Sequence, residues 1–515
     1  EVVSVDPQTF QTDRPKVFAG GGAIERERKS ALQSMADGKR AAISIDRFVK
    51  QVSLLSGRET EGSYPTTLHT NVARYEESCP RALPPFDREQ AVEEASRCID
   101  CKCLECVHAC AFLQHFKSYP RKYVREVYNN LSIAMGTRHA NTMINSCSLC
   151  GQCAAICPNG LDVGAIMKDA RQIMVESKKM PQSTFEFALL DMEYSNSGDC
   201  FFRAHQPGRA QSRYVFFPGC QLPASAPEIV RAAYLDLTER LEGGVGLLLG
   251  CCGVIADWAG QEELYAREVK KLQKAWEELG RPVIITACPT CHQTLRREFA
   301  RDCCVGIWDI LLEKGLPTGF QKLSGKLILH DACGARNQPQ VQQAVREVVA
   351  QMGLELEAHN YTGDAAGCCG FGGLTQFANP AVADAAARLW ADDPHARYLT
   401  YCMNCRDRFT KQGAQAVHLL ELIYGGGKPH QVPGYSLRRD NREKLKRTMR
   451  EELWNEKLSP SPSCVSLHYD GEVGGLLESR MILESDIRTV IEAAEGSGRK
   501  ILHRASGCFI ASRRV

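Results

Sequence analysis

The two stretches that decide the fold are LGCCG at residues 249–253 and AGCCG at residues 366–370. Each lies within a set of five cysteines in the same order: a single Cys, then Cys-Cys-Gly, then Cys-x-x-Cys. The two sets are Cys220, Cys251, Cys252, Cys288 and Cys291, and Cys333, Cys368, Cys369, Cys402 and Cys405. Ten thiols repeated in this way favour metal ligation, and soft thiolates suit iron–sulfur clusters.

Each set belongs to one copy of an internal repeat that covers residues 213–425. The cysteines follow short apolar runs, such as RYVFFPGC at 213–220, PVIITACPTC at 282–291 and KLILHDAC at 326–333. Charged segments with a helical pattern separate these runs. The alternation predicts a parallel α/β sheet in each copy. The cysteine loops are then expected at the carboxyl ends of strands, where open α/β sheets hold their ligands.

Each set of five cysteines exceeds the four thiolates that a cubane cluster takes. Adjacent cysteines cannot easily bind the same iron, so each pair suits two irons or a bridging thiolate. Gly253 and Gly370 follow the pairs and let the backbone approach a cluster, and FGG at 371–373 extends this freedom in the second copy. The alternative is zinc or structural thiols, which the fifth cysteine disfavours because zinc takes four ligands.

A further group of cysteines lies upstream, in residues 90–180. Pro158 follows four cysteines with x2, x2, x3 spacing, which is typical of a cubane [4Fe–4S] ligand loop. These are Cys147, Cys150, Cys153 and Cys157. The expected companion set is Cys98, Cys101, Cys106 and Cys110. Cys103 lies inside the companion set and can replace Cys101, and Ala111 stands where bacterial ferredoxins have Pro.

In ferredoxins with two clusters, the fourth cysteine of each loop ligates the other cluster. This rule predicts one cluster on Cys98, Cys101, Cys106 and Cys157. It predicts a second cluster on Cys147, Cys150, Cys153 and Cys110. A zinc knot is the alternative, but zinc sites more often use two separated Cys-x-x-Cys pairs.

Length and composition limit the class of protein. The chain has 515 residues, enough for roughly three or four domains. Its net charge of +2 does not indicate a nucleic-acid partner, and it has no apolar run of about 18 residues that would predict a membrane span. No signal peptide is visible at the start. The 25 cysteines are spaced locally, as in metal sites, so we expect a reducing cytoplasm.

Residues 213–425 resemble the catalytic B subunit of heterodisulfide reductase and its cysteine-rich-domain relatives, which include iron–sulfur subunits of glycolate, lactate and glycerol-3-phosphate oxidising enzymes. Residues 90–180 resemble the C subunit of heterodisulfide reductase, the ferredoxin-like donor. The resemblance implies that both five-cysteine motifs hold non-cubane [4Fe–4S] clusters at which a disulfide is cleaved. Several relatives have lost cysteines from one copy, whereas this chain keeps all ten. The chain therefore resembles a fusion of these two subunits.

Residues 15–49 are expected to form a strand, a glycine turn and a helix. VFAGGG at 17–22 resembles the last segment of FAD-containing pyridine nucleotide-disulfide oxidoreductases, where this run meets the flavin. Gly20 and Gly21 are the matching flavin contacts, but Gly22 replaces the family's Asp. No GxGxxG follows a strand, so FAD is expected only if an upstream or partner domain completes the site. A generic strand–turn–helix is the alternative.

These observations predict an α/β and α+β multidomain protein, with a helical, ferredoxin-like dicluster domain followed by two repeated parallel α/β cysteine-rich domains. The expected boundaries are 1–50 for the flavin-related remnant, 51–89 for a connector, 90–180 for the dicluster domain, 181–212 for a linker, 213–325 and 326–430 for the two Cys-Cys-Gly domains, and 431–515 for a basic helix and a small α+β piece. The last segment has no predicted chemistry.

The predicted function is an iron–sulfur oxidoreductase within a complex. Electrons from a flavin-containing domain or subunit would pass two cubane clusters and two non-cubane clusters to a disulfide or a similar two-electron acceptor. His330 and Asp331, just before Cys333, supply a proton to a departing thiolate or only complete strand-end hydrogen bonds. The alternative functions are an electron relay in a larger flavin-dependent dehydrogenase, without a substrate site, and a zinc protein without redox activity.

Overall fold

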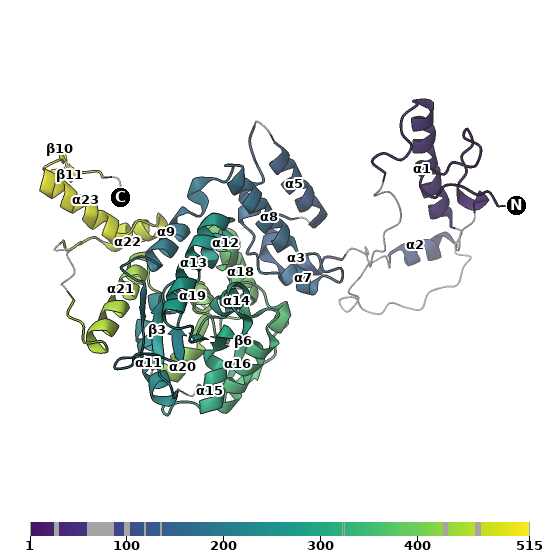
Figure 1. Cartoon of the computed structure of the whole chain (residues 1–515). Helices are drawn as coiled ribbons and strands as arrows, with labels where there is room; N and C mark the ends of the chain where they lie inside the picture. The colour runs from purple at the N-terminus through teal and green to yellow at the C-terminus, as the bar shows by residue number, and fades with distance from the viewer. Residues whose placement is uncertain are drawn as a thin grey trace. The chain divides into compact units, whose positions relative to one another are not determined.

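The computed structural model describes residues 2–24, 30–58, 87–96, 103–117, 120–133, 136–321, 323, 325–425, 431–458 and 465–513 (Figure 1). It divides the chain into two compact units, Glu1–His69 and Thr70–Val515, which are described separately below. The expected ligands Cys98 and Cys101 lie outside the described residues, as do residues 59–86 of the expected connector.

The first unit is built around one helix, α1 (Ala31–Val49) (Figure 1). The strand expected before the glycine turn is reduced to a single bridge between Gln11 and Phe18, and the turn η1 (Gly21–Ala23) follows it. A small apolar cluster holds the helix to these loops; its buried members are Phe10, Ile24 and Ala41.

The second unit begins with short helices that carry the upstream cysteines on their ends and loops. These helices are α2 (Arg88–Ser96), α3 (Glu105–Ala109), α4 (Ala111–His115), α5 (Pro120–Ser132), α6 (Asn141–Asn145), α7 (Gln152–Ile156) and α8 (Val163–Glu176). Met143, Ile144 and Met167 are among the buried side chains of the core that α3 to α8 share. The expected helical character of residues 90–180 is therefore confirmed in its described part.

The first repeat forms a five-stranded sheet in the order β1-β3-β2-β4-β5. Its strands are β1 (Phe202–Ala204), β2 (Tyr214–Phe217), β3 (Val245–Leu249), β4 (Val283–Thr286) and β5 (Cys304–Gly306). The last four are mutually parallel, whereas β1 pairs antiparallel with β3 at the edge. Its helices are α10 (Gln221–Ser225), α11 (Pro227–Arg240), α12 (Val254–Trp258), α13 (Glu262–Glu278), α14 (Pro289–Glu298) and α15 (Ile307–Lys314).

The second repeat forms a four-stranded parallel sheet in the order β7-β6-β8-β9. Its strands are β6 (Lys326–His330), β7 (Glu355–Glu357), β8 (Arg397–Thr400) and β9 (Gln415–His418). Its helices are α16 (Pro339–Gln351), α17 (Thr375–Ala378), α18 (Pro380–Trp390), α19 (Met403–Lys411) and α20 (Leu419–Tyr424). Omitting β1, both sheets have the same order, so the predicted duplication of a parallel α/β layer is confirmed.

One apolar core extends through both sheets because their helices pack together. The same buried cluster contains Leu311 of α15, Phe216 of β2, Val345 and Val348 of α16, and Met352, which directly follows α16. Helices surround β3 and β6 (Figure 1). The parallel strands place all their carboxyl ends on one edge of each sheet, where the cysteine loops begin.

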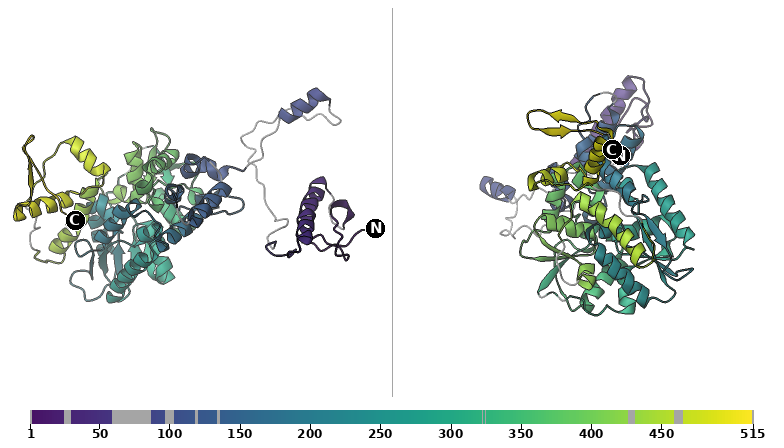
Figure 2. Two further views of the ribbon diagram at one scale, coloured as in Figure 1. Left: turned by 90° about the horizontal axis from the view of Figure 1, so that it is seen from above. Right: turned by 90° about the vertical axis from the view of Figure 1, so that its left-hand side faces the viewer.

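Segments outside the repeats complete the second unit. The expected linker contains α9 (Glu186–Ser195) and strand β1, and the basic segment forms α21 (Tyr435–Glu452). The C-terminal part contains α22 (Gly471–Ser479), α23 (Glu484–Ser497), β10 (Ile501–His503) and β11 (Cys508–Ile510). The last two strands form an antiparallel hairpin, drawn in yellow in Figure 2. None of the described helices is long and apolar enough to cross a membrane.

Candidate iron–sulfur centres

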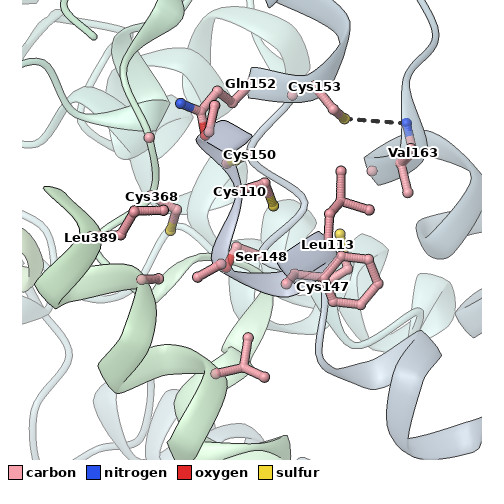
Figure 3. A pocket seen from close by; sticks show the side chains of 18 of the residues that line it. Cys110, Leu113, Cys147, Ser148, Cys150, Gln152, Cys153, Val163, Cys368 and Leu389 are labelled. Atoms are coloured by element: carbon pink, nitrogen blue, oxygen red, sulfur yellow. Dashed lines mark hydrogen bonds between the residues drawn. The ribbon is translucent and has the colours of Figure 1, made fainter. Parts of the chain in front are cut away.

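Four upstream cysteines surround one cavity of about 670 Å³, which is partly open to solvent (Figure 3). Cys110 comes from the junction of α3 and α4, Cys147 and Cys150 from the loop before α7, and Cys153 from α7. Cys368 of the second repeat lines the same cavity. The structure therefore brings together one of the two sets that the exchange rule predicts, and it adds one thiol from the second repeat.

The local backbone explains how this loop presents its sulfurs. Gly151 has a φ of 73°, a left-handed conformation that lets α7 begin directly after Cys150. The Val163 N–H donates to Cys153 Sγ at 3.3 Å, the interaction dashed in Figure 3. Burial raises the pKa of the Cys147 thiol to about 12. Metal ligation would deprotonate such a buried thiol, because a coordinated thiol loses its proton.

The other upstream site is described only in part. Burial, followed by the charges of Cys153, Cys157 and Cys103, raises the pKa of Cys106 to about 11. Cys106 and Cys157, which the exchange rule assigns to one cluster, are therefore neighbours. Cys103 is also a neighbour, so the choice between Cys101 and Cys103 as a ligand stays open.

The five thiols of the first motif lie side by side in one group. Cys251 contacts both Cys220 and Cys252, Cys252 contacts Cys291, and Cys291 contacts Cys288. They follow the ends of three neighbouring parallel strands, β2, β3 and β4. All five line a cavity of about 530 Å³, part of it open to solvent.

The five thiols of the second motif form a matching group. Cys368 contacts Cys333 and Cys369, Cys369 contacts Cys405, and Cys405 contacts Cys402. Cys333 follows β6 and Cys402 follows β8, as their counterparts follow β2 and β4. The adjacent pair differs, because it follows a loop and not the end of a strand.

The three cysteine groups of the second unit meet one another. Cys288 of the first motif lies beside Cys402 of the second, and both line the cavity of the first motif. At the other side of the second motif, Cys150 and Cys368 are close enough for each thiolate charge to disfavour the other. Thiols therefore follow one another from the upstream cavity, through the second motif, to the first.

Several features of this arrangement fit iron–sulfur clusters. A Cβ on Gly219 would lie 3.0 Å from Cys291 Sγ, and one on Gly372 would lie 3.0 Å from Cys368 Sγ, so both glycines keep space beside a sulfur. Thiolates grouped around a larger space are the donor set of a polynuclear cluster.

Comparison with known domain families accounts for all three groups. The family model of a 4Fe-4S dicluster domain matches residues 97–162, and that of a cysteine-rich domain matches residues 214–296 and again 327–406. The chain joins a 4Fe–4S dicluster domain to two cysteine-rich domains. The matched ranges contain every cysteine that the sequence analysis assigned to a cluster.

Similar proteins carry iron–sulfur and redox names. The chain is 23% identical over 364 residues to the B subunit of the fumarate reductase (CoM/CoB) of Methanothermobacter marburgensis, covering 65% of this chain and 73% of that protein. It is 22% identical over 365 residues to an uncharacterized iron–sulfur protein of Methanococcus maripaludis, covering 62% and 69%. A 49-residue stretch is 45% identical to the beta subunit of the NADP(+)-dependent formate dehydrogenase of Moorella thermoacetica, covering 10% and 7%. A heterodisulfide reductase-like electron-transfer protein is therefore supported.

His330 and Asp331 differ in their surroundings within the second cysteine-rich domain. Asp331 is fully buried, pairs with Arg346 at 2.6 Å and accepts hydrogen bonds from Tyr401 and Gly363. Burial lowers the pKa of His330 to about 4, so its imidazole is neutral near pH 7. The Asp331 carboxylate completes hydrogen bonds near the end of β6, whereas both ring nitrogens of His330 are buried without a hydrogen-bond partner among the described residues, so the role of His330 stays a prediction.

A further cavity of about 640 Å³, part of it open to solvent, adjoins the first motif. Cys220 and Cys251 line it, together with side chains from α9, α17, α19 and α21. Its polar and aromatic lining includes Arg408, Lys411, Arg438, Tyr435, Phe187 and Phe377. No chemistry is predicted for these lining residues from the sequence.

Helix α21 is held in place by buried ion pairs. Arg442 donates to Asp191 of α9, and Arg438 pairs with Asp407 of α19. Leu445 and Met449 are buried beneath the helix. Two apolar residues four positions apart in an otherwise charged helix indicate a packed face, and this signal is present in the sequence. The basic helix predicted from the sequence is therefore partly buried and forms part of the cavity wall.

Gly20 and Gly21 of the first unit lie against α1. The Gly21 N–H donates to the Asp37 carboxylate at 2.9 Å, and a Cβ on Gly20 would lie 2.9 Å from the Asp37 Cβ. This close approach accounts for a glycine at both positions. Their contact with FAD stays a prediction.

Proposed function

We propose that the chain carries electrons from a flavin-containing partner to a disulfide, or to a similar two-electron acceptor, as an iron–sulfur subunit of a redox complex. The run of neighbouring thiols from the dicluster domain to the first motif carries this proposal. Iron–sulfur clusters would supply the one-electron carriers. The chain would supply eighteen cysteine ligands, eight in the dicluster domain and ten in the two motifs.

The order of the proposed centres follows from which thiols are neighbours. Cys150 of the dicluster domain lies beside Cys368 of the second motif, and Cys402 of the second motif lies beside Cys288 of the first. Electrons would therefore pass from the dicluster domain to the second motif and then to the first. Two non-cubane clusters, one on each five-cysteine motif, suit the fifth ligand and the adjacent pair.

The acceptor would enter at the first motif, where two cavities adjoin Cys220 and Cys251. Reduction of a disulfide breaks its S–S bond, takes up two electrons and two protons, and releases two thiols. Burial raises the pKa of Tyr435, which lines the outer cavity, to about 12. Its hydroxyl therefore stays protonated near pH 7 and can donate a hydrogen bond to a bound acceptor.

Metal analysis and disulfide reduction test the proposal together. Four [4Fe–4S] clusters predict roughly sixteen irons, with matching labile sulfide, per chain. The loaded chain should reduce a disulfide with an artificial one-electron donor, and added thiol should change the EPR spectrum. Zinc without sulfide, or cubane signals alone with no response to thiol, would contradict it.

An electron relay without its own substrate is the second candidate. The similarity to a formate dehydrogenase beta subunit favours it, because that relative is named as part of a dehydrogenase. A chain that loads its clusters and exchanges electrons with an artificial donor, but never reduces a disulfide, would support the relay.

A further inference from the structure

Two buried arginines at the junction of the dicluster and second cysteine-rich domains lack an acidic partner. Among the described residues of the Thr70–Val515 unit, the buried arginines are Arg171, Arg336, Arg406, Arg408 and Arg442. Arg406 forms ion pairs with Glu421 and Asp407. Arg408 pairs with Asp384, and Arg442 pairs with Asp191. Neither Arg171 nor Arg336 forms an ion pair with a described residue of this unit.

Arg171 is bonded to backbone carbonyls throughout. It is fully buried and donates to Cys147 O at 2.7 Å, and to Trp258 O and Gly373 O at 2.8 Å. It also donates to the carbonyls of Ile144 and Asn145. Carbonyls satisfy its N–H groups but carry no net charge, so its positive charge is not balanced by these contacts.

Arg336 reaches the same cysteine loop from the second cysteine-rich domain. Its Nε donates to Cys150 O at 2.7 Å, and one terminal nitrogen donates to Ala366 O. The remaining terminal nitrogen is buried without a hydrogen-bond partner. Arg336 is three residues beyond Cys333, so the second motif sends this side chain into the Cys150 loop of the dicluster domain. An unpartnered donor here requires an acceptor that the protein alone does not provide.

A buried cation without a counter-charge is costly, and the thiolates beside it offer one. Arg171 donates to Cys147 O and Arg336 donates to Cys150 O, so both guanidinium groups lie beside the loop that carries these two ligands. Four thiolates outweigh the positive charge of an iron–sulfide core, so the site is negative and becomes more so on reduction. Nearby positive charge and N–H donors therefore favour the reduced form.

We propose that Arg171 and Arg336 are the counter-charges of the cluster held by Cys110, Cys147, Cys150 and Cys153, and that they raise its reduction potential. This inference rests on the proposed function, because it assumes that the cluster is present. The raised potential would draw electrons to the side of the dicluster domain that faces the second motif.

Arg336→Gln in the full, cluster-loaded chain is the direct test, because it removes the charge. One cubane component should titrate at a lower potential in a redox titration followed by EPR. A tenfold rise in its oxidised-to-reduced ratio at fixed potential equals about 59 mV for one electron. Arg336→Lys keeps the charge and should restore most of the shift. Arg281→Gln, at an exposed arginine paired with Glu277, is the matched control and should leave the potential unchanged.

Equal potentials in Arg336→Gln and the Arg281→Gln control, with all clusters loaded, would overturn the inference and leave the proposed function intact. Missing clusters in the unaltered chain would instead remove the proposed function itself. Should Arg336→Gln fail to load, Leu389→Lys adds a charge at the partly exposed rim of the same cavity. That variant should raise the potential, and an unchanged value would overturn the inference.

Discussion

The two cysteine-rich domains share a strand order and a set of five thiols but have different neighbours. In the second domain, Gly372 and Gly373 follow the Cys-Cys-Gly-Phe run and lie against the dicluster domain. A Cβ on Gly373 would lie 2.4 Å from Cys147 O. The first domain has Ile255 and Ala256 at the matching positions, and Ile255 lines two cavities beside its thiols.

This difference indicates a division of labour within one duplicated fold. The second domain packs against the proposed source of electrons only because its loop has no side chains at these two positions. The first domain keeps side chains there and borders the two cavities that adjoin Cys220 and Cys251. In the proposed electron path, the second domain is the inner site and the first domain is the outer site.

The largest expected effect comes from removing matched cysteines. Cys369→Ser in the second motif should abolish both disulfide reduction and the reduction of the first-motif centre, because electrons would have to pass it. Cys252→Ser should also abolish disulfide reduction but leave the second-motif centre reducible. EPR of each variant with a donor that reduces the dicluster domain distinguishes these outcomes. The reverse pattern would contradict the proposed order.

The second largest effect is expected from breaking the ion pair that holds helix α21 beside the cavity of the first domain. Asp191→Asn leaves buried Arg442 without its anionic partner, and breaking a buried pair in this way costs about 3–5 kcal/mol of unfolding free energy. Chemical denaturation measures the loss. Glu277→Gln, in an exposed pair with Arg281, is the control and should cost about 0.5 kcal/mol or less. Similar losses in both would show that α21 is not held by Asp191.

The inner contact of the second domain is tested by Gly373→Ala. The added Cβ meets the dicluster backbone, and we expect a loss of about 3 kcal/mol of unfolding free energy, as for other overpacked sites. Gly353→Ala is the matched control, because Gly353 also has a positive φ, of 68°, but open space around its Cβ position. Backbone strain alone should cost it about 1–2 kcal/mol. Equal losses would show that the close approach at Gly373 carries no extra cost.

Acid should weaken the packing of helix α21 before it weakens the contact between the second cysteine-rich domain and the dicluster domain. We expect this change in stability to be the smallest of the four. Burial would raise the pKa of Asp191, but Arg442 and Arg439 lower it more, and Arg438 and Arg406 likewise keep the pKa of Asp407 low. Their stabilisation is complete above the unfolded pKa of about 4 and is lost as pH falls through the lower folded value. Amide hydrogen exchange, followed as the pH falls from about 6 to about 3, should show α21 opening before α18.

A converse order, in which α18 beside the dicluster domain exchanges before α21, would contradict that prediction. The inner contact depends on Arg171 and backbone carbonyls, which do not titrate in this range.

Much of this architecture could be predicted because its signals are local. Apolar runs such as VFF before Cys220 and LIL before Cys333 mark buried strands, and the cysteines that follow them mark the loops at their carboxyl ends. The contacts of Cys288 with Cys402 and of Cys150 with Cys368 could not be predicted in this way. They depend on how separate sheets and helices pack, which spacing within one motif does not specify.

The glycines at 371–373 illustrate the same limit. Their conformational freedom was expected to let the backbone approach a cluster, and Gly372 does lie close to Cys368 Sγ. Their second partner, the backbone at Cys147 and Ser148, belongs to another domain. A basic helix was predicted at α21, but the packing of its short apolar stripe, Leu445 and Met449, was not.

Helix α21 belongs to neither repeat, yet it closes the cavity beside Cys220. Every proposed ligand lies before residue 406, whereas Tyr435 and Arg438 of the cavity wall come later. Acceptor selectivity can therefore change during evolution by substitution or exchange of the tail, while the metal-binding core is inherited intact. Chains with the same cysteines but different tails would then serve different oxidants.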